Sequence, residues 1–429
     1  MAVKCVYHAL VRAWLDRLQP FRTPESKRLA FLFAVVYFAQ GMWYLPNQTI
    51  TIVFKDLGMS AAQVATFFSM TVLPWLLKPG YGLLSDFVPI FGYRRRSYFI
   101  MGSALASLAA VAVVVLGGTG YWALAILFTL MGFGLAFTDV VTDAVMVENG
   151  RKLVLTGAFQ SVQWAAIYGA SILVGLAGGE LAETRSLRTT FLVAAIFPAI
   201  TCLMATAFVH DTRATLDAAA LRGTWQAVVA ASKSRTVWLI AAFIFLFNFS
   251  PSFGPAFTYY QVDVLKFSQR FIGVLAAVQA LGFVVGAFIY APLSKKVPLA
   301  RLVVIAIVLS AVGMLGYLLY RGPRSALAID FTYGILAMMT QLVLLDLAAR
   351  VCPPHVEGTF FALLMSVYNA GQRGSQVVGG YLYDRVGFTR LVLISAVTTA
   401  LMLIMVPWLR VRDIEAQARA QAIVSAGLA

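Results

Sequence analysis

The sequence contains little charge and few residues able to bind metals or form disulfides. Charged residues make up 12% of its 429 residues, about half of their share of roughly 25% in soluble domains. There are only three cysteines, and Cys5, Cys202 and Cys352 lie too far apart to form a paired metal-binding motif. We therefore expect neither a disulfide framework nor a metal site.

Residues that commonly carry catalysis are also scarce. His8, His210 and His355 are the only histidines, and all three lie outside the long apolar runs. The chain has no Gly-Lys-Ser/Thr loop of the kind that cradles a phosphate. These absences argue against an enzyme, against a resident cofactor and against pumping driven by ATP hydrolysis.

Long apolar runs, by contrast, fill most of the chain. Hydrophobic residues account for 61% of it, and the mean hydropathy is +0.83. A spanning helix needs about 20 mostly apolar residues, because a backbone in lipid must satisfy its hydrogen bonds internally. The runs and their breakers predict an all-α membrane protein with twelve transmembrane helices over residues 29–54, 61–84, 97–116, 121–147, 154–177, 189–208, 237–257, 269–291, 302–319, 325–349, 359–381 and 390–409.

The basic residues orient these spans. Positively charged loops stay on the cytoplasmic side of a membrane, and placing both termini there puts Arg94 to Arg96, residues 213–235 and the Lys295-Lys296 pair inside. Shifting the count by one span would place all of them outside. The net charge of +15 thus reflects orientation and attraction to anionic lipid, so no nucleic-acid partner is expected. We expect a monomer in the inner membrane of a bacterial cell.

The longest polar stretch divides the twelve spans into two groups of six. We predict an N-terminal six-helix bundle over residues 29–208 and a C-terminal six-helix bundle over residues 237–409. A cytoplasmic linker over residues 209–236 joins them, and residues 1–28 and 410–429 form cytoplasmic ends. The first 28 residues lack a short apolar core followed by a small-residue cleavage site, so we expect no cleaved signal peptide. An amphipathic surface helix over residues 6–18 is predicted there, with an organelle-targeting segment as the alternative.

A weak internal repeat indicates that the two bundles are related. Asp143 leads to Gly157 in the first half much as Asp346 leads to Gly358 in the second, each acid closing a fourth helix and each glycine opening a fifth. Duplicated bundles are typical of carriers that bind substrate near the bilayer midplane, between the halves. The repeat therefore predicts transport by alternating access.

Several blocks of sequence resemble a known transporter family. The connection from Asp86 to Arg96 is similar to the loop between the second and third helices of the major facilitator superfamily. The folate-biopterin transporter family is resembled by the segments Leu73-Pro-Trp-Leu-Leu-Lys-Pro-Gly-Tyr-Gly82, Phe91-Gly-Tyr-Arg-Arg-Arg-Ser-Tyr98, Phe271-Ile-Gly-Val274, Gly286-Ala-Phe-Ile-Tyr290 and Cys352-Pro-Pro-His-Val-Glu-Gly-Thr-Phe-Phe-Ala-Leu-Leu-Met-Ser-Val-Tyr-Asn369.

This resemblance implies both a fold and a function. The fold is that of the major facilitator superfamily, and the function is secondary active transport of folates or related pterins, driven by symport with protons. Two alternatives stay open, because a fold does not establish a function. One is a carrier of another organic anion, and the other is a transport-inactive assembly or sensor protein.

Arg373 is the first candidate for binding an anionic substrate. An ionisable side chain within a span costs at least about 2.5 kcal/mol, so it needs a partner, a water-filled cavity or a function. The guanidinium pairs bidentately with carboxylates, and a folate carries two of them in its glutamate tail. The alternative is that an acid on a neighbouring helix neutralises Arg373.

Lys78 and two aspartates form a second group of embedded charges. Lys78 is expected either to bind the anion or to extend to the inner interface, and pairing with Asp139 is also predicted. Asp139 and Asp143 lie one turn apart on one helix face. Because two close carboxylates in a low dielectric do not both ionise easily, Asp139 is the candidate proton-coupling site.

The remaining charges near the cytoplasmic ends are predicted to form a gate. We expect Asp143 and Glu148 to hold the basic loop, and Asp346 to pair with Lys295, Lys296 or Arg301 in the second half. Asp330, near the outer end of the tenth span, is expected to extend to the interface or to belong to an outer gate. The predicted cytoplasmic gate consists of Asp86, Arg94, Arg95, Arg96, Asp143, Glu148 and Asp346.

Polar and aromatic side chains within the spans are candidates for recognising an aromatic ring. A pterin presents an edge that a carboxylate binds through two hydrogen bonds and a face on which an aromatic side chain stacks. For each of these residues the alternative is a hydrogen bond to a neighbouring helix or, for tryptophan, a place at the membrane interface. The predicted substrate-binding residues besides Arg373 and Lys78 are Gln40, Trp43, Asn47, Gln48, Gln163, Asn248, Asn369 and Gln372.

Overall fold

The computed structural model describes residues 21–116, 120–153, 155–209, 211, 213, 215, 218–352 and 357–416. The surface helix expected over residues 6–18 lies outside these ranges. Within them the chain forms helices and short connections, and the extended pairing is limited to the isolated bridges Ile90–Tyr93 and Tyr93–Arg213. The all-α expectation is therefore confirmed for the described residues.

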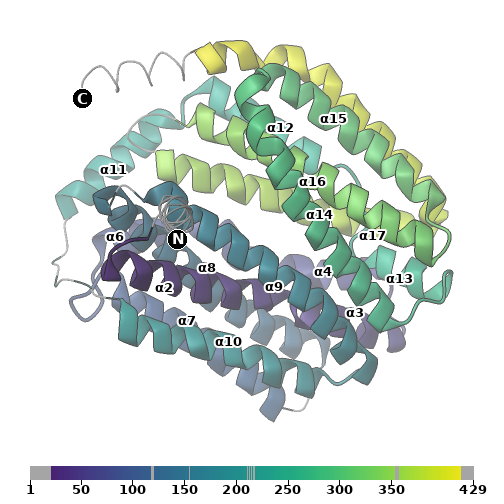
Figure 1. Ribbon diagram of the computed structural model, residues 1–429, viewed down its shortest axis with the longest axis horizontal. Helices are drawn as coiled ribbons and strands as arrows, with labels where there is room; N and C mark the ends of the chain where they lie inside the picture. The colour runs from purple at the N-terminus through teal and green to yellow at the C-terminus, as the bar shows by residue number, and fades with distance from the viewer. Residues whose placement is uncertain are drawn as a thin grey trace, which may run out of the picture.

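The helices follow one another with short connections (Figure 1). The first half of the chain contains α2 (Pro24–Gly41), η1 (Met42–Tyr44), α3 (Pro46–Asp56), α4 (Ala61–Thr71), α5 (Leu73–Leu76), α6 (Lys78–Phe87), α7 (Arg96–Val115), α8 (Tyr121–Leu153), α9 (Thr156–Thr184) and α10 (Leu187–Phe208). The second half contains α11 (Ala218–Ala231), α12 (Arg235–Asn248), α13 (Pro255–Asp263), α14 (Gln269–Lys296), α15 (Leu299–Gly316), η2 (Tyr317–Leu319), α16 (Pro323–Val351), α17 (Glu357–Leu401) and η3 (Met402–Leu409).

Proline and glycine set where helices break. Pro46, Pro74 and Pro79 each lie in the first turn of a new helix, where a missing N–H costs no hydrogen bond. Gly254 takes a positive φ of 46° just before α13, which favours glycine. Gly387 also has a positive φ, of 77°, and this non-helical conformation kinks α17.

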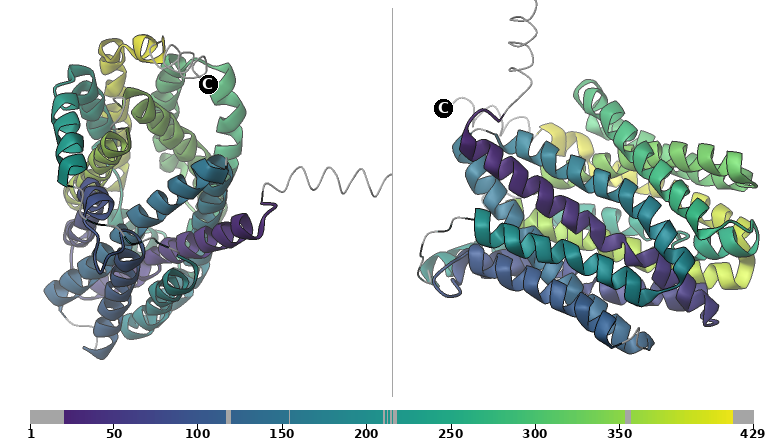
Figure 2. Two further views of the ribbon diagram at one scale, coloured as in Figure 1. Left: turned by 90° about the vertical axis from the view of Figure 1, so that its left-hand side faces the viewer. Right: turned by 60° about the horizontal axis from the view of Figure 1, so that its bottom comes forward.

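Nine helices within the described residues are long and apolar enough to cross a membrane. Twelve spans were expected, and three of them are not counted as separate long apolar helices. Residues 61–87 are divided among α4, α5 and α6, and α12 has only 14 residues before the break that precedes α13. Residues 359–409 count as one apolar stretch, although the kink at Gly387 lies within it. The long helices run roughly lengthwise and side by side in the right-hand view of Figure 2.

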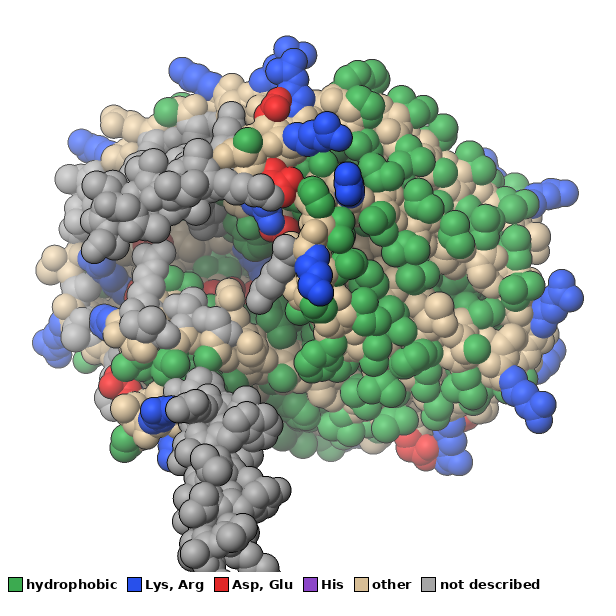
Figure 3. Space-filling view, turned by 45° about the horizontal axis from the view of Figure 1, so that its top comes forward, with side chains coloured by type: hydrophobic (Ala, Val, Ile, Leu, Met, Phe, Trp, Pro, Cys, Tyr) green, Lys and Arg blue, Asp and Glu red, His purple; other side chains and the backbone are tan. Residues whose placement is uncertain are grey.

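Large apolar side chains cover much of the outer surface. Phe288 is 76% exposed and Leu203 is 68% exposed. Figure 3 shows a broad hydrophobic area with lysine and arginine gathered mostly at its margins. An exposed apolar surface of this extent fits contact with lipid.

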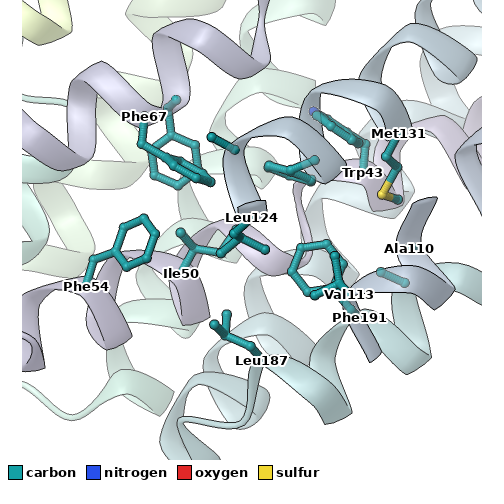
Figure 4. Close-up of a cluster of buried hydrophobic side chains, with 14 of the residues drawn as sticks. Trp43, Ile50, Phe54, Phe67, Ala110, Val113, Leu124, Met131, Leu187 and Phe191 are labelled. Carbon is teal, nitrogen blue, oxygen red and sulfur yellow. The ribbon is translucent and has the colours of Figure 1, made fainter. Parts of the chain in front are cut away.

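The buried cores are drawn mainly from one half of the chain at a time. One cluster joins η1, α3, α4, α7, α8 and α10 around Trp43 and Phe191, and of its buried members only Ala256 and Tyr259 come from the second half (Figure 4). Another cluster is built entirely from residues 239–414. The helices of each half therefore share apolar contacts that bury their facing sides.

Glycine allows the closest approach between the two halves. α9 packs along α14, and α4 packs along α17. A Cβ added at Gly175 would lie 2.6 Å from the backbone nitrogen of Ala277, and one at Gly273 would lie 2.3 Å from the carbonyl oxygen of Gly175. Because these distances leave no space for a side chain, the backbones of α9 and α14 touch directly.

Polar contacts also join the halves at the helix ends opposite the loop with Arg94 to Arg96. Lys55 forms an ion pair with Asp263 at 2.6 Å, and Arg270 pairs with Glu180 at 2.6 Å. The Tyr259 hydroxyl donates to the carbonyl oxygen of Met59 at 2.5 Å. These contacts hold the ends of α3, α9, α13 and α14 together.

A bulky residue at the contact of α9 and α14 should destabilise the fold. We expect Gly175→Val to lower the free energy of unfolding by about 1–3 kcal/mol, the usual cost of overpacking. Gly169 on the same helix has no atom within 4 Å of its added Cβ, so Gly169→Val is the matched control. Thermal unfolding in detergent measures both variants. Equal unfolding temperatures would contradict the close contact.

Candidate functional site

A cluster of polar and charged side chains lies between α2, α6 and α8. Lys78 Nζ forms an ion pair with Asp139, and Gln40 donates from Nε2 to Oδ1 of Asp139 at 2.8 Å. Asp143 accepts a hydrogen bond from the hydroxyl of Tyr37. Because Asp139 is only 4% exposed, the ion pair is largely shielded from water. The predicted pairing of Lys78 with Asp139 is confirmed.

Helix geometry explains how these side chains meet. Asp139 and Asp143 share one face of α8 because they are four residues apart. Lys78 opens α6 directly after the break at Leu77, with Pro79 in the first turn. The cluster therefore places two carboxylates around a single ammonium group, and a proton on either acid would relieve the repulsion between them.

Arg373 lies on α17 beside a cavity of about 420 Å³. Its Nη1 donates to Oε1 of Gln376 at 3.2 Å. No carboxylate in the described part of the chain lies within ion-pair distance of it, so the structure does not support neutralisation by a neighbouring acid. Ser69 and Phe249 line the same cavity from the two halves of the chain.

One further observation relates Arg373 to another candidate. Asn369 lines the same cavity, one turn earlier on α17. Both residues therefore border one space in which a ligand could lie.

A second cavity, of about 520 Å³, is lined entirely by residues between Phe247 and Thr399. Asn248 and Gln372 are the predicted binding residues that line it. Its size falls within the range of about 300–1,000 Å³ that is usual for small-molecule sites.

Asp330 also lines this second cavity. The expectation that Asp330 extends to the membrane interface was wrong, because it is only 3% exposed and accepts hydrogen bonds from Tyr320 and Tyr317. The sequence contained one indication of this contact, because Tyr317 and Tyr320 precede Asp330 by 13 and 10 residues and an acid in an apolar run needs hydrogen-bond donors.

Four of the predicted binding residues have other surroundings. Trp43 is 4% exposed and stacks on Phe128 with ring centroids 4.0 Å apart, so it belongs to the apolar core and lines none of the described cavities. Gln48 donates to the backbone oxygen of Gln269 at 2.8 Å and so joins α3 to α14. Asn47 Oδ1 and Gln163 Nε2 are buried with no hydrogen-bond partner among the described residues.

Arg95 is the central residue of the basic loop. It contacts Asp86 at 2.6 Å and Glu148 at 2.6 Å, and its Nη1 donates to Ser85 Oγ at 2.9 Å. Burial by itself would lower the pKa of the Arg95 guanidinium, but the carboxylates of Asp86 and Glu148 raise it. The side chain therefore stays charged and links the end of α6 to α8.

Asp211 is a member of this loop network that sequence reasoning missed. Its carboxylate accepts hydrogen bonds from the backbone N–H groups of Arg95 and Arg96, at 2.7 and 3.2 Å. The side chains of Arg94 and Arg96 donate to backbone oxygens of Thr215 and Thr206. The position of a single acid in a polar linker does not indicate which loop it will contact, so this role of Asp211 could not be predicted from the sequence.

Two acids of the predicted gate have different partners from those expected. Asp143 does not hold the basic loop, because its carboxylate lies against Tyr37 within the polar cluster. Asp346 pairs with Arg350 on its own helix at 2.8 Å, and no ion pair joins it to Lys296 or Arg301 among the described side chains, which do not include that of Lys295. Arg350 also lies 3.9 Å from Glu415. Residues four apart on a helix share one face, so Arg350 can reach Asp346 without any contact between helices.

Comparison with known proteins identifies similar sequences. The BT1 family profile matches residues 39–425. The folate-biopterin transporter of Synechocystis sp. is 33% identical over 412 residues, which cover 90% of this chain and 81% of that protein. The probable folate-biopterin transporter 4 of Arabidopsis thaliana is 26% identical over 459 residues, covering 88% of this chain and 92% of that protein.

Solved structures show the same fold at low identity. The D-xylose-proton symporter superposes with a TM-score of 0.67 and 15% identity, over 88% of this chain and 95% of that one. A POT family transporter in complex with a thioalcohol-conjugated peptide superposes with a TM-score of 0.69 and 13% identity, over 90% and 97% of the two chains. The chain thus has the fold of major facilitator transporters and is an integral, multi-pass membrane protein.

Breaking the Lys78–Asp139 pair should destabilise the protein more than removing both charges. We expect Lys78→Gln and Asp139→Asn each to cost about 3–5 kcal/mol, because each leaves an unpaired buried charge. The double variant should lose much less than the sum. The exposed Arg185–Asp56 pair is the control, and its neutral variants should change stability by less than about 1 kcal/mol. Additive losses at Lys78 and Asp139, measured by unfolding in detergent, would contradict a coupled pair.

Proposed function

The chain belongs to the BT1 family, and we propose that it is a secondary active transporter of folates or related pterins that works by alternating access. The observation that carries this proposal is Arg373, a guanidinium without a carboxylate partner among the described residues, beside a cavity lined from both halves of the chain. A glutamate tail supplies the carboxylates that such a group binds. The names of the relatives in Synechocystis and Arabidopsis support the substrate class.

We propose a fold of twelve spans in two six-helix bundles over residues 29–208 and 237–409, with both termini in the cytoplasm. The segmented stretches 61–87 and 235–263 would each cross once, and α17 with η3 would cross twice around Gly387. The separate apolar cores of the two halves support this division. The basic loops support the orientation, and the membrane is proposed to be the inner membrane of a bacterial cell. The linker over residues 209–236 contains α11, which lies near α6 at one end of the molecule (Figure 1).

The polar contacts between the halves support alternating access. In the proposed orientation the ion pairs Lys55–Asp263 and Arg270–Glu180 lie at the outer side. The exposed pair Arg270–Glu180 contributes little, about 0–1 kcal/mol, so it can separate when the other side closes. The structure would correspond to a state closed to the outside.

Coupling to protons is proposed through the Lys78–Asp139 pair. When Asp139 is ionised, it forms an ion pair with Lys78. When Asp139 takes up a proton, Lys78 loses this partner and can bind a substrate carboxylate. Proton and anion then bind together, which is the requirement for symport. Lys78 and Arg373 would share the anion, and Asn369, Gln372 and Asn248 would supply hydrogen bonds at the two cavities.

The network around Arg95 is proposed to be part of the cytoplasmic gate. Asp86, Glu148 and Asp211 fix the loop between α6 and α7 to α8 and to the end of the first half. A neutral residue at position 95 would remove the ion pairs with Asp86 and Glu148 and leave the contacts with Asp211. No role in catalysis is proposed for any of these residues.

Replacement of Arg373 tests substrate binding. We expect Arg373→Gln to reduce uptake of labelled folate into proteoliposomes by at least about tenfold, because a charge-assisted hydrogen-bonded pair contributes about 1.5–3 kcal/mol. Arg385→Gln, an exposed position on the same helix, is the control. Uptake of an unrelated organic anion in parallel separates a folate carrier from a carrier of other anions. Full folate uptake by a folded Arg373→Gln variant would contradict the assignment.

Replacement of Asp139 tests coupling. We expect Asp139→Asn to keep exchange of substrate across the membrane and to lose accumulation driven by an inward proton gradient, because the amide mimics a permanently protonated acid. Counterflow and gradient-driven uptake measure the two activities in the same vesicles. Unchanged accumulation would place the coupling site elsewhere.

A further inference from the structure

The cavity of about 520 Å³ has a chemical character different from that of the Arg373 cavity. All of its lining residues come from the second half of the chain, and Asp330 is the only charged one among them. Aromatic rings of Phe253, Phe257, Tyr317 and Tyr333 contribute to its wall. With one carboxylate and no lining cation, this cavity suits a planar aromatic ligand that donates hydrogen bonds, and it disfavours an anion.

The position of Asp330 is fixed before any ligand arrives. Oδ2 accepts from the Tyr320 hydroxyl at 2.8 Å, and Oδ1 accepts from the Tyr317 hydroxyl at 3.3 Å. Gln261 Nε2 donates to the Tyr320 hydroxyl at 2.9 Å. The Phe253 ring packs on Tyr317, with centroids 5.0 Å apart. Each carboxylate oxygen can accept about two hydrogen bonds, so each has one acceptor position left for a ligand.

A buried hydroxyl in the wall of this cavity lacks a hydrogen-bond partner among the described residues. Ser395 is 1% exposed, lines the cavity, and its Oγ has no hydrogen-bond partner among the described residues. An unmet hydroxyl in a buried wall costs free energy unless a ligand or water satisfies it. It is an observation independent of Asp330 that points to a polar occupant.

Gln376 connects this cavity to Arg373. Its side chain lines the 520 Å³ cavity, while its Oε1 accepts the hydrogen bond from Arg373 Nη1 at 3.2 Å. A ligand with an amine-rich ring at one end and carboxylates at the other could therefore reach both sites. Because Asp330 is negative and Arg373 is positive, the ring end of such a ligand would lie at Asp330 and its carboxylates at Arg373.

We propose that the Asp330 cavity binds the aminopyrimidinone ring of the substrate, with Asp330 accepting two parallel hydrogen bonds from the ring edge and the surrounding aromatic residues packing on its faces. This inference rests on the proposed function, and it assigns the two ends of a folate to two separate cavities. Biopterin, which has the ring and no carboxylate, would use the Asp330 cavity alone.

The competing explanation is structural. Asp330 could serve only to tie α16 to η2 through the two tyrosines. In that case replacing it would lower stability and would leave the relative affinities for the two halves of a folate unchanged. Ligand fragments distinguish the two explanations.

The experiment measures binding of biopterin and of p-aminobenzoylglutamate to the purified full-length chain in detergent. We expect Asp330→Asn to weaken biopterin binding about ten- to hundredfold, as for loss of charge-assisted hydrogen bonds, and to leave p-aminobenzoylglutamate binding within about threefold. Arg373→Gln should show the opposite pattern. Asp413→Asn, at an exposed acid in the helical turns that follow η3, should change neither affinity.

A second variant protects the test against misfolding of Asp330→Asn. Ala337 lines the cavity two helical turns from Asp330, and Ala337→Phe should fill it and exclude biopterin with the carboxylate intact. Wild-type biopterin affinity in folded Asp330→Asn or Ala337→Phe protein would overturn the inference and leave the proposed function standing. If the wild-type chain bound neither fragment and transported no folate, the proposed function would fail as well.

Discussion

The absence of water in the hydrocarbon layer is the constraint on which this structure depends. Each backbone group must be paired within its helix or face a cavity, and each charge needs a partner or a function. Most of the chain meets this demand with apolar helices that bury one side and expose the other. The exceptions are few, and they coincide with the proposed machinery: the breaks around Lys78, the Lys78–Asp139 pair, Arg373 beside its cavity and Asp330 among tyrosines.

Much of this could be predicted from sequence, because hydropathy and charge act along one helix at a time. The apolar runs, the proline breaks and the basic loop all follow from local composition. Lys78 and Asp139 could be paired because both are charges in need of a partner within the same group of spans. What could not be predicted was which side of each helix faces a neighbour. Trp43 was expected to bind substrate, but its side of the helix faces the apolar core, where it stacks on Phe128. Asp143 was expected to face the basic loop, but its carboxylate faces Tyr37.

Long-range partners were missed where several equally plausible ones existed. Asp346 had three basic candidates on other segments, yet the ion pair forms with Arg350 one turn away. Asp330 looked like an interfacial residue because its position in the span was known and its rotation about the helix axis was not. Tertiary packing decides that rotation, and it turns Asp330 toward Tyr317 and Tyr320.

The direct backbone contact of α9 and α14 limits the kinds of movement that are open to the molecule. Gly175, Gly179 and Gly273 meet with no side chain between them, so a shift along the helix axis would bring residues with side chains to positions where only glycine fits. A change of tilt keeps the glycines in register and costs no such collision. The contact of α9 and α14 therefore permits one helix to tilt against the other and resists sliding of one helix along the other.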